Sequence, residues 1–194
     1  MCLTKPMANI PEGDELSDES ILKRWNHLPM FIKIPAGLVA GWIVLILIIQ
    51  IFNTVMAASI MPESCPENSG NCVRIAHDGT SYRAENLEPL RFNATREEVI
   101  SALENWFEDR WFASVISIDD EADTTTLHGV DHTEFWFFAD DVFASVTCSQ
   151  GYAELTLHSQ SRLGKGDMGE NNRRLVELTK DISSTEWSNE SCEG

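Results

Sequence analysis

The stretch IPAGLVAGWIVLILIIQIFNTVMAASIM, residues 34–61, contains no charged side chain over 28 consecutive positions. As an α-helix it would extend ~42 Å at about 1.5 Å per residue, which exceeds the ~30 Å hydrocarbon core of a bilayer. A core helix of a soluble protein would be shorter and would carry a polar stripe along one side. The sequence therefore predicts a single transmembrane helix over residues 34–61, with the lipid bilayer as its partner.

The charges that flank this apolar stretch predict its orientation. Lys23, Arg24 and Lys33 precede it, whereas residues 62–73 contain acidic residues and neither lysine nor arginine. Cytoplasmic flanks of membrane spans carry the positive excess. We therefore expect a protein of the cell membrane with residues 1–33 as a cytoplasmic tail, residues 62–182 as an extracytoplasmic domain and residues 183–194 as a polar C-terminal tail.

Small residues at positions 57–59 leave a second interpretation open, namely a cleaved secretory signal peptide. Such a peptide has a short basic leader and an apolar region of roughly 7–15 residues. Both the leader and the apolar stretch are longer in this chain, and this favours a retained anchor.

Several residues in and before the span favour further contacts. Gly37 and Gly41 form a G-x-x-x-G pattern, through which a partner helix of another membrane protein could pack closely. Gln50 and Asn53 lie roughly on the opposite face and could hydrogen-bond to another helix. A short interfacial helix on the inner leaflet is predicted from four apolar residues that share one face: Ile21, Leu22, Trp25 and Leu28.

The charge balance excludes one class of partner. The chain has 31 acidic and 14 basic residues, with a formal net charge of −17. Nucleic-acid binding requires clustered lysine and arginine to neutralise phosphates, so we expect no nucleic-acid partner. The acidic surface of the outer domain is interpreted as a solvated face, and a partner protein bound through that domain stays an option.

Four cysteines follow the span: Cys65, Cys72, Cys148 and Cys192. In an oxidising compartment they are expected to form disulfides. Cys65 and Cys72 are close enough in sequence to close the loop after the membrane, and the pair Cys148–Cys192 then remains. The C-x6-C spacing is not typical of a zinc knuckle, so we expect no metal site and no cofactor.

The outer domain is predicted to be an α+β domain. Thr95 and Glu98 form a capping box before a helix, and residues 171–181 return to a helical period. Between them lie segments rich in β-branched and aromatic residues, with short turns, which predict strands over 111–118, 124–130, 134–138, 142–147 and 153–159. We therefore expect an antiparallel sheet of about five strands with two helices on one face, preceded by a single transmembrane helix.

Three motifs carry a resemblance to a known family. They are Cys65-Pro66 followed by Asn71-Cys72-Val73, the strand segment Phe138–Val142, and the run Ser159–Gly164 followed by Asp167–Arg174. Over about residues 65–182 the chain resembles the family called domain of unknown function 1499. That family has no established activity, so the resemblance implies a fold and no reaction.

The same motifs define a candidate ligand-binding cluster: Asp140, Asp141, Ser159, Ser161, Arg162, Asp167, Asn171 and Arg174. In a structural interpretation, arginines between aspartates make bidentate hydrogen bonds that fix a glycine-rich loop to the sheet. In a functional interpretation, the loop 164–169 and the following helix N-terminus hold a small ligand, with Arg162 contacting its anionic group.

No catalytic residue is predicted from this cluster. A set of Ser161, His158 and Asp167 is disfavoured because residues three apart on a strand point to opposite faces. Asp140 and Asp141 are adjacent and also point apart, which disfavours a shared calcium ion. We therefore expect a non-enzymatic binding or assembly module. The alternative is a small-ligand-binding protein or a hydrolase that uses the Asp/Arg/Asn cluster.

Overall fold

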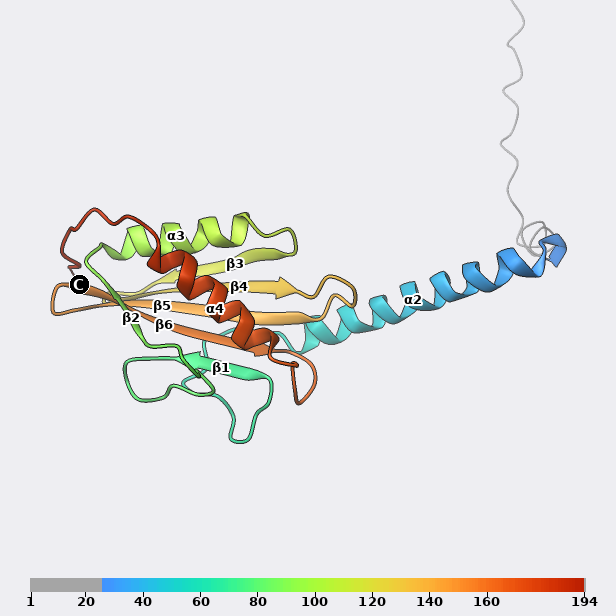
Figure 1. Cartoon of the computed structure of the whole chain (residues 1–194), viewed down its shortest axis with the longest axis horizontal. Coiled ribbons are helices and arrows are strands. Elements are labelled where there is room, and N and C mark those ends of the chain that lie inside the picture. The colour runs from blue at the N-terminus through green and yellow to red at the C-terminus, as the bar shows by residue number, and fades with distance from the viewer. Residues whose placement is uncertain (1–25, 194) are drawn as a thin grey trace, which may run out of the picture. The chain divides into compact units, whose positions relative to one another are not determined.

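The computed structural model describes residues 26–193, and the interfacial helix expected around Ile21, Leu22 and Trp25 therefore lies largely outside the described residues. The chain divides into two units after residue 45, and the second unit includes the last turns of the long helix α2, Met30–Val55. Figure 1 shows the elements in chain order. Their bounds are α2 Met30–Val55, β1 Cys72–Ile75, β2 Leu90–Phe92, α3 Arg96–Glu108, β3 Ala113–Asp120, β4 Thr124–His132, β5 Ala139–Ser149, β6 Tyr152–Ser161 and α4 Glu170–Ser183.

Helix α2 contains residues 34–55 of the apolar stretch that was predicted to cross a membrane, and residues 56–61, which were included in the predicted helix, follow its end. It has 26 residues, Met30–Val55, and it is the one helix in the described part of the chain that is long and apolar enough for a span. It begins four residues before the predicted start, so Pro35 lies inside the helix rather than in its first turn. At about 1.5 Å per residue its length is ~39 Å.

A single antiparallel sheet forms the centre of the folded domain after α2. Its strand order is β1-β6-β5-β4-β3, and β2 pairs with the other half of β6. The predicted α+β class with an antiparallel sheet is confirmed. The sheet has six strands, where about five were expected, because β1 and β2 are only four and three residues long. Such short strands give no readable alternation of polar and apolar residues.

The strand predicted over residues 134–138 is wrong. This segment is the connection between β4 and β5, and Phe137 within it has a φ of 55°. The turn is closed by Phe137 N–H donating to Thr133 O (2.9 Å) and by Thr133 N–H donating to Phe138 O (3.0 Å). Its aromatic residues satisfy β propensity, but the positive φ is incompatible with an extended strand.

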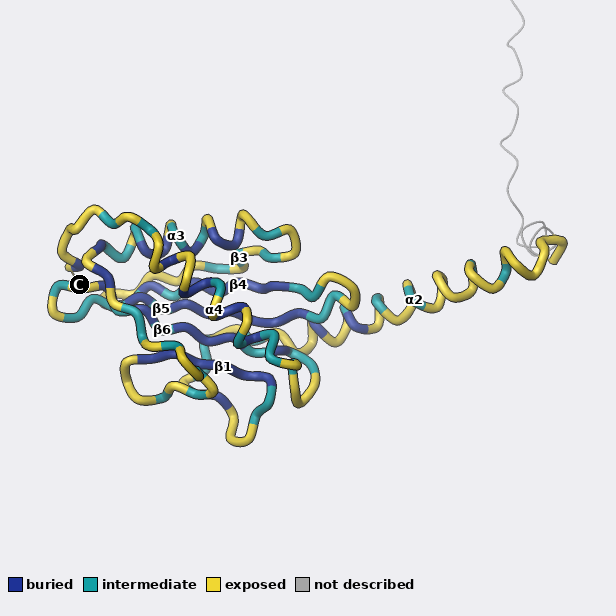
Figure 2. Tube along the Cα trace, viewed as in Figure 1, coloured by how far each residue is buried: buried dark blue, intermediate teal, exposed yellow. Residues whose placement is uncertain are grey.

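Helices α3 and α4 cover one face of the sheet, as predicted (Figure 1). The capping box at the start of α3 is present: Glu98 N–H donates to Thr95 Oγ1, and Thr95 N–H donates to Glu98 Oε2. Leu103 and Phe107 of α3 and Leu175 and Leu178 of α4 are buried in one core with the sheet. Figure 2 shows this core as the buried central strands beneath the two helices.

Both disulfides have the predicted pairing, Cys65–Cys72 and Cys148–Cys192. The second one fixes the segment after α4 to the β5–β6 end of the sheet, where Cys192 N–H donates to Gly151 O (2.9 Å). Trp187 in the same segment packs on Phe92, with ring centroids 4.8 Å apart. The polar C-terminal tail is therefore partly packed against the core in its described portion.

Candidate functional site

Strand register brings the candidate residues to one end of the sheet. Asp131 at the end of β4 lies opposite Asp140 at the start of β5, and Asp140 lies opposite Ser161 at the end of β6. Because side chains alternate along a strand, Asp140 and Asp141 point to opposite faces of the sheet. The candidate residues consequently separate into two hydrogen-bonded clusters, one on each face.

The first cluster lies under α4 and is centred on Arg174, whose side chain is 1% exposed. Its Nε donates to Asp131 Oδ2 (2.9 Å) and its Nη2 donates to Asp140 Oδ2 (2.7 Å). Nη1 donates to Ser159 Oγ (3.1 Å) and to Asn171 Oδ1 (2.8 Å). The guanidinium is therefore surrounded by acceptors from three strands, β4, β5 and β6, and from its own helix.

Asn171 completes this first cluster. Its Nδ2 donates to Ser161 Oγ and to Asn71 O, both at 3.0 Å, and its Oδ1 accepts from Ser159 Oγ at 2.6 Å. Asn71 in turn lies next to β1, so the contact connects α4 to the far edge of the sheet. Five of the predicted site residues are thus held in a buried internal network: Asp140, Ser159, Ser161, Asn171 and Arg174.

The electrostatics of the first cluster are those of a buried ion triad. Burial raises the pKa of Asp140, although the nearby charge of Arg174 opposes the shift. Burial also acts to raise the pKa of Asp131, but the charges and hydrogen bonds of Arg174 and Arg110 prevail and lower it. The pKa of Arg174 is raised: burial acts to lower it, and the two carboxylates outweigh that effect.

The second cluster lies on the opposite face and joins Asp141, His128 and Arg162. Arg162 Nε donates to Asp141 Oδ2 (2.9 Å) and Nη2 donates to Oδ1 (2.6 Å), a bidentate pair. His128 Nε2 lies 2.8 Å from Asp141 Oδ1. Burial acts to raise the pKa of Asp141, but hydrogen bonds from His128 and Arg162 lower it overall.

This second cluster contacts the end of α2. Arg162 Nη1 donates to Asn53 O (3.0 Å), one of the carbonyls left without an intrahelical partner at the helix C-terminus. Phe137 O accepts hydrogen bonds from Gln50 Nε2 (3.0 Å) and Asn53 Nδ2 (2.8 Å). The two amides, for which a bond to another helix was considered, therefore bond to the β4–β5 connection of their own chain.

Asp167 takes part in neither cluster. Its carboxylate accepts from the backbone N–H groups of Gly169 and Asn171, both at 3.0 Å, at the start of α4. Burial acts to raise its pKa, but these backbone hydrogen bonds lower it. The helix N-terminus, where the functional interpretation seats an anionic ligand, thus already holds a carboxylate of the protein itself.

A cavity of about 420 Å³ lies beside the first cluster. Its apolar wall contains Trp136, Phe138, Leu163 and Met168, and its polar lining includes three predicted residues, Asp140, Ser161 and Asp167. A wider depression of about 730 Å³ shares Asp167 and Met168 with it. The predicted residues Asp141, Ser159, Arg162, Asn171 and Arg174 do not line the smaller cavity.

Sequence reasoning missed three members of the clusters: His128, Asp131 and Asn71. Asp131 accepts from both Arg174 and Arg110 and is as central as Asp140. His128 and Asp131 lie on a strand with no motif of its own, and only the β4–β5 register shows that they face the predicted residues. Asn71 was noted only as part of a cysteine motif.

His158 contacts neither Ser161 nor Asp167. Its Nε2 lies 3.2 Å from Gln160 Oε1 and 3.6 Å from Cys72 Sγ, and the ring is fully buried. Burial lowers the pKa of His158 to about 4. Among the described residues, Cys65, Cys72 and His158 have ligand-type atoms within 4.8 Å of one another, but both sulfur atoms are joined in a disulfide.

Comparison with known proteins gives one match. A family model described as "Protein of unknown function (DUF1499)" matches residues 63–182, the folded domain after α2. No curated protein and no solved structure matches the chain.

Proposed function

The chain belongs to the DUF1499 family, and because that description assigns no activity, we propose a function from the geometry. The protein is a single-pass membrane protein that carries a non-enzymatic α+β binding or assembly module on the extracytoplasmic side. Its N-terminus lies in the cytoplasm. The observation that carries this proposal is the hydrogen bonding between the end of α2 and the domain, through Asn53, Phe137 and Arg162.

These contacts favour a retained anchor over a cleaved signal peptide. Cleavage after residues 57–59 would remove Asn53 and leave Arg162 without its carbonyl acceptor. Cleavage after residue 58 or 59 would also remove Ala58 N–H, which lies 3.4 Å from Asp141 Oδ2. A buried donor left without its partner costs about 1–3 kcal/mol, more for a charged group. The two disulfides support an oxidising, extracytoplasmic location for the domain.

The two clusters support a non-enzymatic role. The central arginines of the two clusters, Arg174 and Arg162, are paired with carboxylates and with further acceptors of the protein itself. The serine hydroxyls in the first cluster hydrogen-bond to Asn171, and the carboxylate that faces Ser161, that of Asp140, is already held in an ion pair by Arg174. Such a set stabilises the packing of α4 and the sheet, and it offers no activated nucleophile.

The proposed topology predicts the labelling of two cysteines by a membrane-impermeant maleimide. Cys2 should react only after intact cells are lysed. In a Cys2→Ser background, Ala122→Cys lies at the exposed β3–β4 turn. It should react while the membrane that holds the protein is intact, once any cell wall or other layer outside that membrane has been removed. The chain should migrate at its full mass of 21.8 kDa and stay in the membrane fraction at high pH. A shorter, soluble form, or the reverse labelling, would disprove the anchor or its orientation.

The 420 Å³ cavity favours a second candidate function, namely the binding of a small, largely apolar ligand. Native mass spectrometry of the full chain purified from membranes separates the two candidates. The assembly module predicts a stoichiometric complex with itself or a partner protein, unchanged by Leu163→Trp, which fills the cavity. A monomer that carries a small molecule, lost in the Leu163→Trp variant, would favour the ligand-binding alternative.

A further inference from the structure

Three connections of the domain emerge at one end of the sheet. The pairings Ala113↔Asp131 and Asp140↔Ser161 bring together the α3–β3, β4–β5 and β6–α4 connections. These connections carry a set of exposed, large apolar side chains that we call the apolar rim: Trp111, Phe112, Phe135, Trp136 and Met168. Trp111 is 96% exposed and Met168 is fully exposed.

The members of the rim are neighbours in space. Phe135 and Trp136 stack edge to face, with ring centroids 4.7 Å apart. Met168 lines both depressions at this end, together with Trp111 and Phe112 in one and with Trp136 in the other. Contiguous exposed apolar surface is uncommon on soluble proteins, and it usually marks a contact surface for a protein or a membrane.

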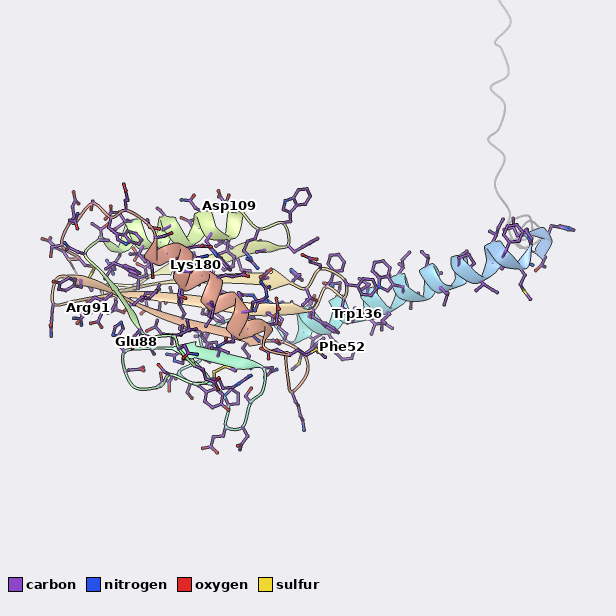
Figure 3. The ribbon with its side chains drawn as sticks, viewed as in Figure 1. Phe52, Glu88, Arg91, Asp109, Trp136 and Lys180 are labelled. Carbon is purple, nitrogen blue, oxygen red and sulfur yellow. A yellow bond between two sulfur atoms is a disulfide. The ribbon has the colours of Figure 1, made fainter. Side chains whose placement is uncertain are left out.

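The rim is attached to the last turns of α2. Phe137, between Trp136 and β5, accepts hydrogen bonds from Gln50 and Asn53, which precede the end of α2 at Val55 by five and two residues. At about 1.5 Å per residue, these positions lie only ~3–8 Å along the helix axis from its end. In Figure 3, Trp136 and Phe52 lie at the same end of the domain, and Arg91 lies at the other.

A loop held at this level of a membrane helix is near the lipid headgroups. With the charged Lys33 at the inner boundary, the ~30 Å hydrocarbon core takes up about 20 residues of α2, so the end of the helix at Val55 reaches the interfacial layer. Tryptophan and other amphipathic aromatic side chains are enriched in that layer. We propose that the apolar rim rests in the headgroup region of the extracytoplasmic leaflet, so that the domain lies against the bilayer that anchors it.

The proposal rests on the proposed function, because it requires α2 to span the membrane. It attributes the contact between the apolar rim and the bilayer to burial of apolar side chains rather than to charge attraction. Acidic residues Glu134 and Glu170 lie among the rim residues beside Arg110 and Arg173, and the whole chain has a net charge of −17. Attraction to anionic lipid is therefore not expected, and uncharged or zwitterionic headgroups suffice.

The test uses the full chain with Cys2→Ser, reconstituted in phosphatidylcholine nanodiscs, with one nitroxide label at a time. The labelled sites are Phe135→Cys in the rim, Ala122→Cys at the opposite end of the sheet, and Ile43→Cys in α2; all three native side chains are exposed. Paramagnetic resonance then measures the collision of each label with oxygen, which concentrates in lipid, and with a water-soluble nickel chelate.

We expect the oxygen-to-nickel ratio at Phe135→Cys to be several-fold higher than at Ala122→Cys and lower than at Ile43→Cys. If Ile43→Cys is shielded from nickel but Phe135→Cys matches Ala122→Cys, the rim lies in water and the inference is wrong, while the anchor stands. That result would favour a protein partner for the rim. If Ile43→Cys also collides freely with nickel, both the anchor and the inference are wrong.

Discussion

Replacing Arg174 with methionine is expected to lower the free energy of unfolding of the outer domain by about 3–5 kcal/mol. Methionine fills a similar volume but leaves Asp140 buried without a counter-ion and leaves Asp131 with Arg110 alone. Removing one partner of a buried ion pair is costly because the other charge remains in a low-dielectric environment. Urea unfolding of the full chain in a mild detergent, followed by tryptophan fluorescence with the disulfides intact, measures the change.

Arg173 provides a matched control on the same helix. It pairs with Glu170 and Glu177 on the surface, and its side chain is 50% exposed. Exposed pairs contribute about 0–1 kcal/mol, so Arg173→Met should have a small effect. Adding Asp140→Asn to the Arg174→Met variant should recover part of the lost stability, because one unpaired charge is removed. Equal effects of Arg173→Met and Arg174→Met would contradict the buried-charge explanation.

This comparison also tests what the motif residues do. Asp140, Ser159, Asn171 and Arg174 were singled out as a candidate ligand site, and they form one buried hydrogen-bonded network. If the network serves the packing of α4, its loss lowers stability and nothing else. Leu163 lines the cavity beside Asp140 but is not a member of this network, so it can be varied separately.

Local signals in the sequence predicted the local elements well. The capping box of Thr95 and Glu98 identified the start of α3 because both hydrogen bonds form within one turn. The opposite directions of Asp140 and Asp141 followed from the period of two along a strand. The long apolar helix was predicted from composition alone, but its end at Val55, six residues before the predicted one, was not.

Features that depend on distant parts of the chain could not be predicted. Asp131 faces Asp140 only because β4 and β5 pair in one particular register, and a shift of one residue would turn it to the other face. The aromatic segment around Phe135 and Trp136 was mistaken for a strand because composition does not reveal the positive φ at Phe137. Its actual position, beside α2, required the folded structure.

Acidification is expected to destabilise the domain through His158. Burial lowers the pKa of this histidine from 6.5 to about 4 in the folded state. Between these two values the unfolded chain binds a proton on His158 and the folded chain does not, so stability falls as the pH falls. The contribution of neutral His158 to stability is complete above about pH 6.5. Roughly 3 kcal/mol of it is lost by about pH 4, because each unit of pKa difference corresponds to about 1.36 kcal/mol.

The groups that face His158 change its pKa less than burial does, and their effects oppose one another. Gln160, which hydrogen-bonds to it, and the charge of Asp141 raise its pKa, whereas the charge of Arg74 acts with burial to lower it. The aspartates of the two clusters also titrate in the acid range, so the informative quantity is the difference between variants. Their contributions are common to the native chain and to a variant that lacks only His158.

In His158→Phe the dependence of unfolding free energy on pH between 7 and 4 should be flatter than in the native chain by about 3 kcal/mol over that range. Phenylalanine can fill the buried ring position beside Phe143 without a titrating group. His77→Phe, at an exposed position, is the control for the replacement of a histidine by phenylalanine as such. Urea unfolding at steps of half a pH unit measures the pH dependence of the unfolding free energy of both variants. A native slope that survives in His158→Phe would assign the acid sensitivity to the carboxylates instead.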